Sequence, residues 1–299
     1  MRFFIAAALL SFATVPTPAS ADLLTWSVLT ARPKPTADAT IAYGSDEMQK
    51  VDVWLPRGKG PFPVVLMVHG GCWTSSIADR SLMNWIADDL RNAGVAVWNI
   101  DYRGVDRPGG GYPGTFADAA KASDQLTANA RKFNLDTRRI VAVGHSAGGH
   151  LALWLAARPR LASTSPLYTK HPLPIRHVIS LGGLPDLEAT AADPTNGCGT
   201  DVVAQLVGTP SPEHPDVYAD TSVPRLVPLG VPQDLVNGHE DHIIPFHLAT
   251  DYIAKAQAAG DTATLHTVAA TGHVELIAPE TAAWAEAKRL ILLDTAKTK

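Results

Sequence analysis

Residues 140–157 read IVAVGHSAGGHLALWLAA, and this stretch decides the fold. Residues 140–143 are apolar and mostly β-branched, which is typical of a strand buried on both faces of a parallel sheet. Residues 147–157 are rich in Ala and Leu and predict a helix. Between them lies a G-x-S-x-G pattern, whose glycines allow a serine to occupy a tight turn between a strand and a helix. We therefore predict that Ser146 is a nucleophile whose hydroxyl projects above the sheet.

Strand and helix patterns alternate along the rest of the chain, without an internal repeat or a dividing linker. Strands are expected at residues 49–55, 63–68, 95–100, 140–143, 178–181, 232–236 and 263–268. Helices are expected at residues 81–93, 115–133, 147–157, 246–259 and 279–295. The alternation predicts an α/β protein with a mostly parallel central sheet and helices on both faces. We expect one domain over residues 22–299, with residues 185–228 as a small cap.

Composition excludes several classes of function. The chain has 299 residues, of which 46% are hydrophobic, and a formal net charge of -4. This is an ordinary globular composition, and without a run of Lys or Arg it gives no basic surface for nucleic acid. No stretch is long and apolar enough to predict a membrane span or anchor.

The first residues have the features of an export signal. Arg2 is followed by an apolar segment at residues 3–12, and Pro16 and Pro18 then end the helix that this segment predicts. Residues 19–21, ASA, offer a small-x-small cleavage pattern. We predict a signal peptide at residues 1–21 and a mature protein that is secreted or periplasmic.

A second motif, HGGCW at residues 69–73, directly follows the expected strand at residues 63–68. Its glycines let backbone amides approach the oxygen of a tetrahedral intermediate, so Gly70 and Gly71 are predicted to form an oxyanion hole. Ala147, the residue after the serine, is expected to supply the other amide.

Both motifs resemble those of the esterase and arylformamidase branch of the α/β-hydrolase superfamily. HGGCW is similar to its HGGxW oxyanion motif, GHSAGGH at residues 144–150 to its nucleophile turn, and DYR at residues 101–103 to a structural turn. The likeness covers roughly residues 50–290. It implies the α/β-hydrolase fold, a Ser-His-Asp triad, no cofactor, and cleavage of esters or activated amides. Cys72 and the export signal depart from the pattern.

The fold carries its triad in the chain order serine, acid, histidine. His273 lies in TGHVEL at residues 271–276, after the last expected strand, and this segment resembles the GHxELI stretch of the same branch. His273 is therefore the predicted base. His266 is the alternative, but it falls inside the expected strand.

Asp186, Glu240 and Asp241 are the candidates for the acid. Asp186 follows the strand at residues 178–181 and is more typical of a helix cap. Residues 237–245, NGHEDHIIP, resemble the HGxxDxxVP turn of the branch, with Asp241 at the acid position. The resemblance therefore favours Asp241.

Cysteines and histidines also raise a disulfide and a metal site as alternatives. An exported protein could join Cys72 and Cys198, but the sequence does not place their sulfurs, and we interpret Cys72 as a pocket or packing residue. The three histidines His239, His242 and His247 lack the spacing of an HExxH or tetrahedral set. We expect no metal and no cofactor.

These observations predict a serine carboxylesterase that hydrolyses small to medium carboxylic esters. An aryl-formamide hydrolase is the alternative enzyme, and a non-catalytic binding protein is a third interpretation. Trp73 and His145, next to the two motifs, are predicted to contact the substrate. The expected partner is a small-molecule ester, and the sequence does not determine the oligomeric state.

Overall fold

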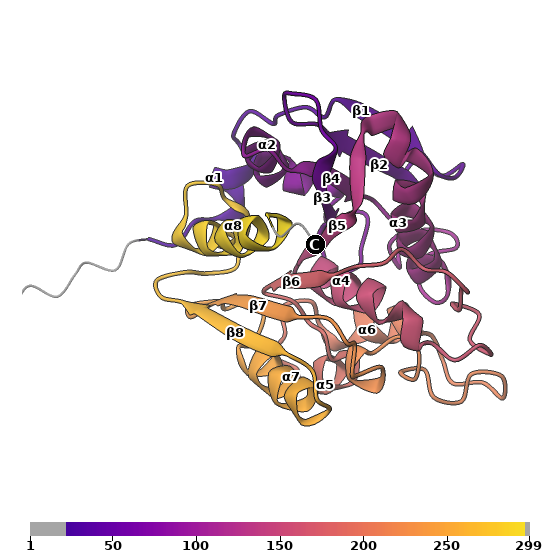
Figure 1. Ribbon diagram of the computed structural model, residues 1–299. Coiled ribbons are helices and arrows are strands. Elements are labelled where there is room, and N and C mark those ends of the chain that lie inside the picture. Colours follow the sequence, from indigo (N-terminus) through magenta and orange to yellow (C-terminus); the bar gives the residue numbers. More distant parts are fainter. Residues whose placement is uncertain (1–21, 297–299) are drawn as a thin grey trace, which may run out of the picture.

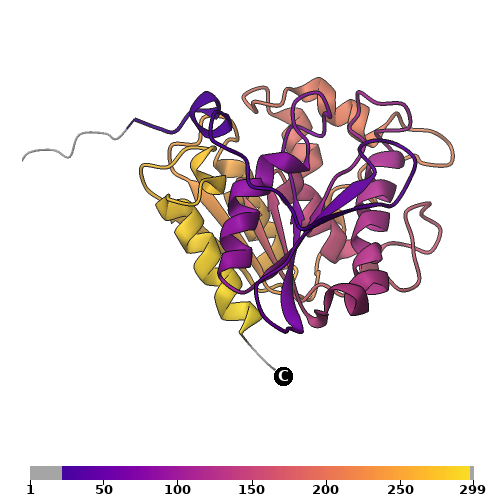
Figure 2. The ribbon, with the colours of Figure 1, turned by 90° about the horizontal axis from the view of Figure 1, so that it is seen from above.

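The computed structural model describes residues 22–296, which form an eight-stranded sheet with helices on both faces (Figures 1 and 2). The strands are β1 (Ala39–Ala42), β2 (Lys50–Trp54), β3 (Phe62–Val68), β4 (Ala96–Ile100), β5 (Leu135–His145), β6 (His177–Leu181), β7 (Gln233–Gly238) and β8 (Ala263–Val268). They pair in the order β1-β2-β4-β3-β5-β6-β7-β8. The pairs β1–β2 and β2–β4 are antiparallel, and the other neighbours are parallel.

The centre of the sheet explains the apolar runs in the sequence. β3 lies between β4 and β5, and every residue from Val64 to Val68 is buried. The register pairs Val68 with Gly144, so β3 and β5 end side by side. Because parallel strands end at a common edge, this register brings residues 69–73 beside the turn that carries Ser146.

Helices form two layers, one on each face of the sheet. They are α1 (Trp26–Thr30), α2 (Asn84–Asn92), α3 (Gly114–Phe133), α4 (Ala147–Ala157), α5 (Leu187–Ala192), α6 (Thr200–Val207), α7 (His247–Ala258) and α8 (Ala282–Thr295). Side chains of α1, α2 and α8 pack in one apolar cluster, and those of α3, α4, α6 and α7 pack in the other. Figure 1 shows α1, α2 and α8 grouped on one side of the sheet. Every residue of α4 is buried, as its composition predicts.

The predicted fold class is confirmed, and all seven predicted strands are present. β5 begins at Leu135, five residues before the expected start. β1, α1, α5 and α6 were not predicted, and α5 and α6 lie within residues 185–228. The predicted signal peptide at residues 1–21 lies outside the described residues.

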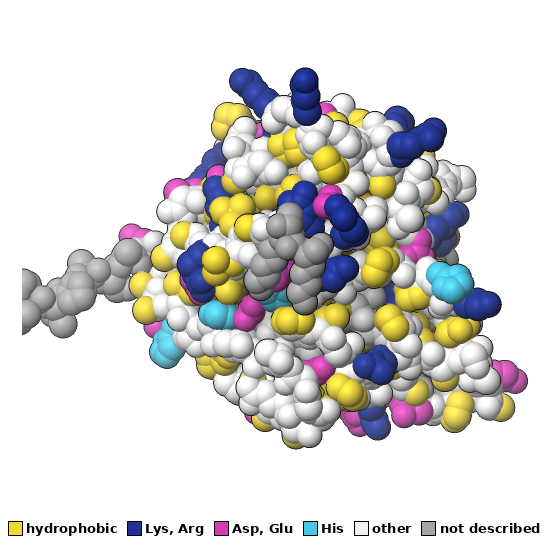
Figure 3. Space-filling model, in the orientation of Figure 1, with side chains coloured by type: hydrophobic (Ala, Val, Ile, Leu, Met, Phe, Trp, Pro, Cys, Tyr) yellow, Lys and Arg dark blue, Asp and Glu magenta, His cyan; other side chains and the backbone are white. Residues whose placement is uncertain are grey.

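The surface bears both charges. On the face shown in Figure 3, acidic and basic side chains are interspersed rather than gathered by sign. Within residues 22–296 no helix combines the length and apolar character that crossing a bilayer requires.

Candidate active site

Ser146 occupies a strained turn between β5 and α4. Its φ is +55° and its ψ is -124°, a conformation that non-glycine residues rarely adopt. The Ser146 amide donates to the carbonyl of Leu181 at 2.8 Å, which fixes the turn to the end of β6. A Cβ on Gly144 would lie 1.9 Å from the Gly148 carbonyl oxygen, and one on Gly148 would lie 2.2 Å from that of Val68. The glycines of the motif are thus required by close backbone contact.

His273 and Asp241 come together from the loops that follow β8 and β7. Nδ1 of His273 lies 2.7 Å from Oδ2 of Asp241, and both side chains are almost fully buried. The other carboxylate oxygen, Oδ1, accepts hydrogen bonds of 2.9 Å from the amides of Ile243 and Ile244. Asp241 is therefore held in one orientation, with one oxygen available to the imidazole.

The other acid candidates have different partners. Asp186 is the N-cap of α5 and accepts from the amide of Ala189 at 3.0 Å, and it also pairs with Lys255. Glu240 is exposed, and its carboxylate lies 3.2 Å from Nδ1 of His239. Neither has a hydrogen bond to His273 among the contacts of the described residues.

The alternative base is also engaged elsewhere. Nε2 of His266 lies 2.7 Å from Asp234, and its Nδ1 lies 3.0 Å from Glu286. Both ring nitrogens of His266 are thus occupied within β8 and its neighbours, whereas His273 lines the same pocket as Ser146.

Gly70, Gly71 and Ala147 lie next to the serine. A Cβ on Gly70 would lie 3.0 Å from Cβ of Ser146, so the Gly70 backbone packs directly against the nucleophile turn. Gly71 has a φ of +107° and lines the pocket. Ala147 is the first residue of α4, where a backbone N–H has no partner within the helix. This arrangement suits the binding of a negatively charged oxygen.

The loop of residues 69–73, here called the HGGCW loop, is held in place by His69 itself and by the DYR turn at residues 101–103. Nδ1 of His69 lies 2.7 Å from the Gly70 carbonyl, and Nε2 lies 2.9 Å from Asp101. Tyr102 stacks on the His69 ring at 4.4 Å and donates through its hydroxyl to the His69 carbonyl at 2.9 Å. Arg80 donates to the second oxygen of Asp101 at 2.9 Å. The buried network fixes the loop beside Ser146.

His145 precedes Ser146 in the chain and lies against His273 in the pocket. Its Nε2 donates to the His273 carbonyl at 3.1 Å, and the two rings are 4.4 Å apart. Burial and the neighbouring His273 lower the pKa of His145 well below its usual range, so the ring is neutral at physiological pH. The ring lines the pocket and also fixes the backbone of the predicted base.

Trp73, which was predicted to contact the substrate, is not among the residues that line the pocket. Its side chain is fully buried, and its Nε1 donates to Nδ1 of His150 at 3.2 Å. A φ of +52° at Trp73, after one of +50° at Cys72, turns the indole into the core instead of the pocket. The indole that lines the pocket belongs to Trp26 of α1, which was not among the predicted site residues.

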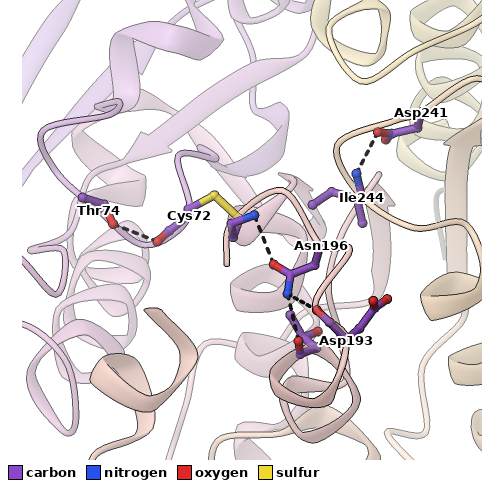
Figure 4. Close-up of a disulfide and its surroundings, with 8 residues drawn as sticks. Cys72, Thr74, Asp193, Asn196, Asp241 and Ile244 are labelled. Carbon is purple, nitrogen blue, oxygen red and sulfur yellow. Dashed lines mark hydrogen bonds between the residues drawn. A yellow bond between two sulfur atoms is a disulfide. The ribbon is translucent and has the colours of Figure 1, made fainter. Parts of the chain in front are cut away.

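A disulfide joins Cys72 to Cys198 beside the pocket (Figure 4). It connects the HGGCW loop with the segment before α6. The neighbouring Gly197 amide donates to the Ile243 carbonyl at 2.7 Å, and the Ile243 amide in turn bonds Asp241. Cys72 lines the pocket as expected, and the disulfide together with the Gly197–Ile243 hydrogen bond links the HGGCW loop to the loop that carries Asp241.

The pocket above Ser146 has a volume of about 420 Å³. It is lined by Trp26, Thr30, Gly71, Cys72, Ile77, Ala78, Leu82, His145, Ser146, Gly197, His242, Ile243 and His273. Most of this lining is apolar, and the polar groups belong chiefly to the serine and the histidines. Such a pocket suits an organic substrate with a small polar centre.

His239, His242 and His247 do not converge on a common point. His239 pairs with Glu240, His247 lies 3.1 Å from Asp193, and His242 lines the pocket. Among residues 22–296, no cluster of three or more His, Cys, Asp or Glu side chains has the arrangement of a metal site.

Fold and site together define a member of the α/β-hydrolase superfamily. The family model BD-FAE matches residues 51–255, more than half of the chain, so the chain belongs to the BD-FAE family.

Related proteins are described as esterases. A probable isoprenylcysteine alpha-carbonyl methylesterase of Arabidopsis thaliana is 30% identical over 119 residues, which are 40% of this chain and 24% of that protein. The versiconal hemiacetal acetate esterase of Dothistroma septosporum is 35% identical over 119 residues, 39% of this chain and 35% of that protein. The matches thus span about a quarter to a third of these relatives.

Solved structures share the fold over nearly the whole chain. A truncated carbohydrate esterase from gut microbiota superposes with a TM-score of 0.73 at 21% identity, covering 89% of this chain and all of that one. Thermogutta terrifontis esterase 2, phosphonylated by sarin, gives a TM-score of 0.70 at 18% identity and covers 92% and 100% of the two chains.

Proposed function

We propose that this chain is a serine carboxylesterase that hydrolyses small to medium carboxylic esters through an acyl-enzyme. The observation that carries the proposal is the arrangement around one pocket. Ser146 on its strained turn and His273 line it, and Asp241 lies behind His273 at 2.7 Å. The esterase names of the relatives support the same reaction class.

Acylation begins with proton transfer from Ser146. Because Nδ1 of His273 faces Asp241, Nε2 is the nitrogen that accepts the serine proton. The serine oxygen attacks the ester carbonyl, and the amides of Gly70, Gly71 and Ala147 stabilise the oxygen that becomes negative. Asp241 stabilises the imidazolium, which then gives its proton to the leaving alcohol as the ester C–O bond breaks.

Deacylation repeats these steps with water. His273 takes a proton from water, the oxygen attacks the acyl carbon, and the same amides hold the second tetrahedral intermediate. When the bond to Ser146 breaks, the imidazolium returns the proton to the serine oxygen. The products are a carboxylic acid and the free enzyme.

The test is hydrolysis of a panel of p-nitrophenyl esters, acetylated xylan and N-formylkynurenine by the parent protein and by Ser146→Ala. We expect ester turnover by the parent and a loss of several orders of magnitude in the variant, with thermal melts showing that both are folded. Higher kcat/KM on N-formylkynurenine than on every ester would identify an aryl-formamide hydrolase instead. Turnover by Ser146→Ala within tenfold of the parent would overturn the mechanism.

We further propose that the chain is exported and begins at Asp22 after cleavage. The Cys72–Cys198 disulfide supports this, because such bonds persist in oxidising compartments. Intact-mass analysis of protein recovered outside the cytoplasm of a bacterial host would give the mass of residues 22–299. A retained Met1 would contradict the proposal.

A further inference from the structure

One wall of the pocket has no part in the reaction described above. It is formed by residues 23–31, here called the N-terminal arm, which include α1. Trp26 and Thr30 of the arm line the pocket, while Leu29 is fully buried in the apolar cluster to which α2 and α8 also contribute. The arm precedes residues 51–255, the part that matches the BD-FAE family, so it is a feature of this chain outside the matched region.

The arm is anchored to the loop that carries His273. Glu275 is buried, and one of its carboxylate oxygens accepts from the Leu24 amide. Its other oxygen accepts from the Gly272 amide at 3.0 Å. Arg32, the residue directly after the arm, forms an ion pair with Glu280. One buried carboxylate therefore couples the position of the arm to the residue before the catalytic histidine.

This anchoring sets the indole of Trp26 against two histidines. Its ring centroid lies 6.0 Å from that of His145 and 6.2 Å from that of His273, with interplanar angles of 70° and 74°. The indole is only partly buried, and it faces a pocket that also contains Ile77 and Leu82. Ile77 is 64% exposed, so the apolar lining continues to the mouth of the pocket.

We propose that Trp26 determines specificity by forming the wall against which the apolar group of the ester packs. The inference rests on the proposed esterase function and names the residue that selects among its substrates. An apolar side chain left partly exposed beside a nucleophile gains burial only when a substrate covers it. Each methylene that a substrate buries completely raises kcat/KM by about fourfold, so the wall favours propionate and butyrate over acetate.

The test compares the parent with Trp26→Ala, Trp26→Phe and Val28→Ala on p-nitrophenyl acetate, propionate and butyrate. Val28 is the matched control, because it belongs to the same short helix but is 53% exposed and does not line the pocket. In Trp26→Ala we expect kcat/KM on butyrate to fall about fourfold to tenfold more than on acetate. Trp26→Phe should keep most of the dependence on chain length, and Val28→Ala all of it.

A structural role for Trp26 predicts a different pattern, since a displaced His273 would slow every ester by the same factor. An equal loss on all three esters in Trp26→Ala, or an unchanged profile, would overturn the inference while leaving the esterase function intact. Failure of the parent to hydrolyse any ester would overturn the proposed function itself. Thermal melts and labelling of Ser146 by a fluorophosphonate report whether each variant keeps a folded site.

Discussion

Replacing Asp241 by Asn is predicted to disable the enzyme through the proton on His273. Asn has the shape of Asp, but one of its two terminal groups is a hydrogen-bond donor. The amides of Ile243 and Ile244 require an acceptor at the position of Oδ1, so the Asn oxygen stays there. The NH₂ group then faces Nδ1 of His273, where the carboxylate oxygen lies at 2.7 Å. His273 must accept at Nδ1 and carry its proton on Nε2, so it cannot take the proton of Ser146.

The expected loss is on the order of 10³–10⁴ in kcat, or about 4–5.5 kcal/mol of transition-state stabilisation, as for the same change in serine proteases. The assay is steady-state hydrolysis of p-nitrophenyl butyrate, with thermal melts to exclude unfolding. Glu240→Gln and Asp186→Asn are the matched controls and should each cost less than about tenfold. A nearly normal kcat in Asp241→Asn, together with a large loss of kcat in folded Glu240→Gln or Asp186→Asn, would refute the assignment of Asp241 as the acid.

Three further predictions follow from other parts of the structure. Short esters, from acetate to butyrate, should be preferred over dodecanoate because the pocket holds only about 420 Å³, and a higher kcat/KM on dodecanoate would contradict this. The Cys72–Cys198 bond closes a sequence separation of 126 residues, so replacing both cysteines by Ser should lower the free energy of unfolding by up to about 5 kcal/mol in urea titrations. An unchanged midpoint of unfolding in urea would contradict this prediction. Burial opposes the charged form of His177, but the hydrogen bond to Asp234 at 2.7 Å and the nearby carboxylate of Asp294 at 3.7 Å outweigh it and raise its pKa to about 9. Because the folded-state pKa is raised, the charged His177 stabilises the folded state. This stabilisation is complete below about pH 6.5 and is lost as the pH rises through about 9. His177→Gln should therefore destabilise the protein by up to about 3 kcal/mol at pH 6 and much less at pH 9.5, and an equal effect at both pH values would exclude the mechanism.

The sheet was predictable where both of its faces are covered. Residues 63–68 of β3 and 140–143 of β5 are continuous apolar runs, because helices cover them on both faces of the sheet. β1 escaped prediction because it is an edge strand of four residues, none of them fully buried. The five residues of α1 are likewise too few to show a helical period.

The residues at the strand ends were also predictable, since parallel strands deliver Ser146, Asp241 and His273 to one edge of the sheet. The pocket walls were not. The position of Trp73 depends on left-handed backbone at two consecutive non-glycine residues, which no local pattern signals. The arm that carries Trp26 is held by the burial of Leu29 and by the hydrogen bond from the Leu24 amide to Glu275, a contact between segments 251 residues apart in the sequence.

The central claim, that Ser146 is the nucleophile, is tested most directly by covalent labelling. The parent and Ser146→Ala are treated with a fluorophosphonate, and the adduct is located by peptide mass mapping. We predict one adduct per chain on Ser146 in the parent and none in the folded variant. Labelling of Ser146→Ala at the same rate, or an adduct on another residue of the parent, would contradict the account.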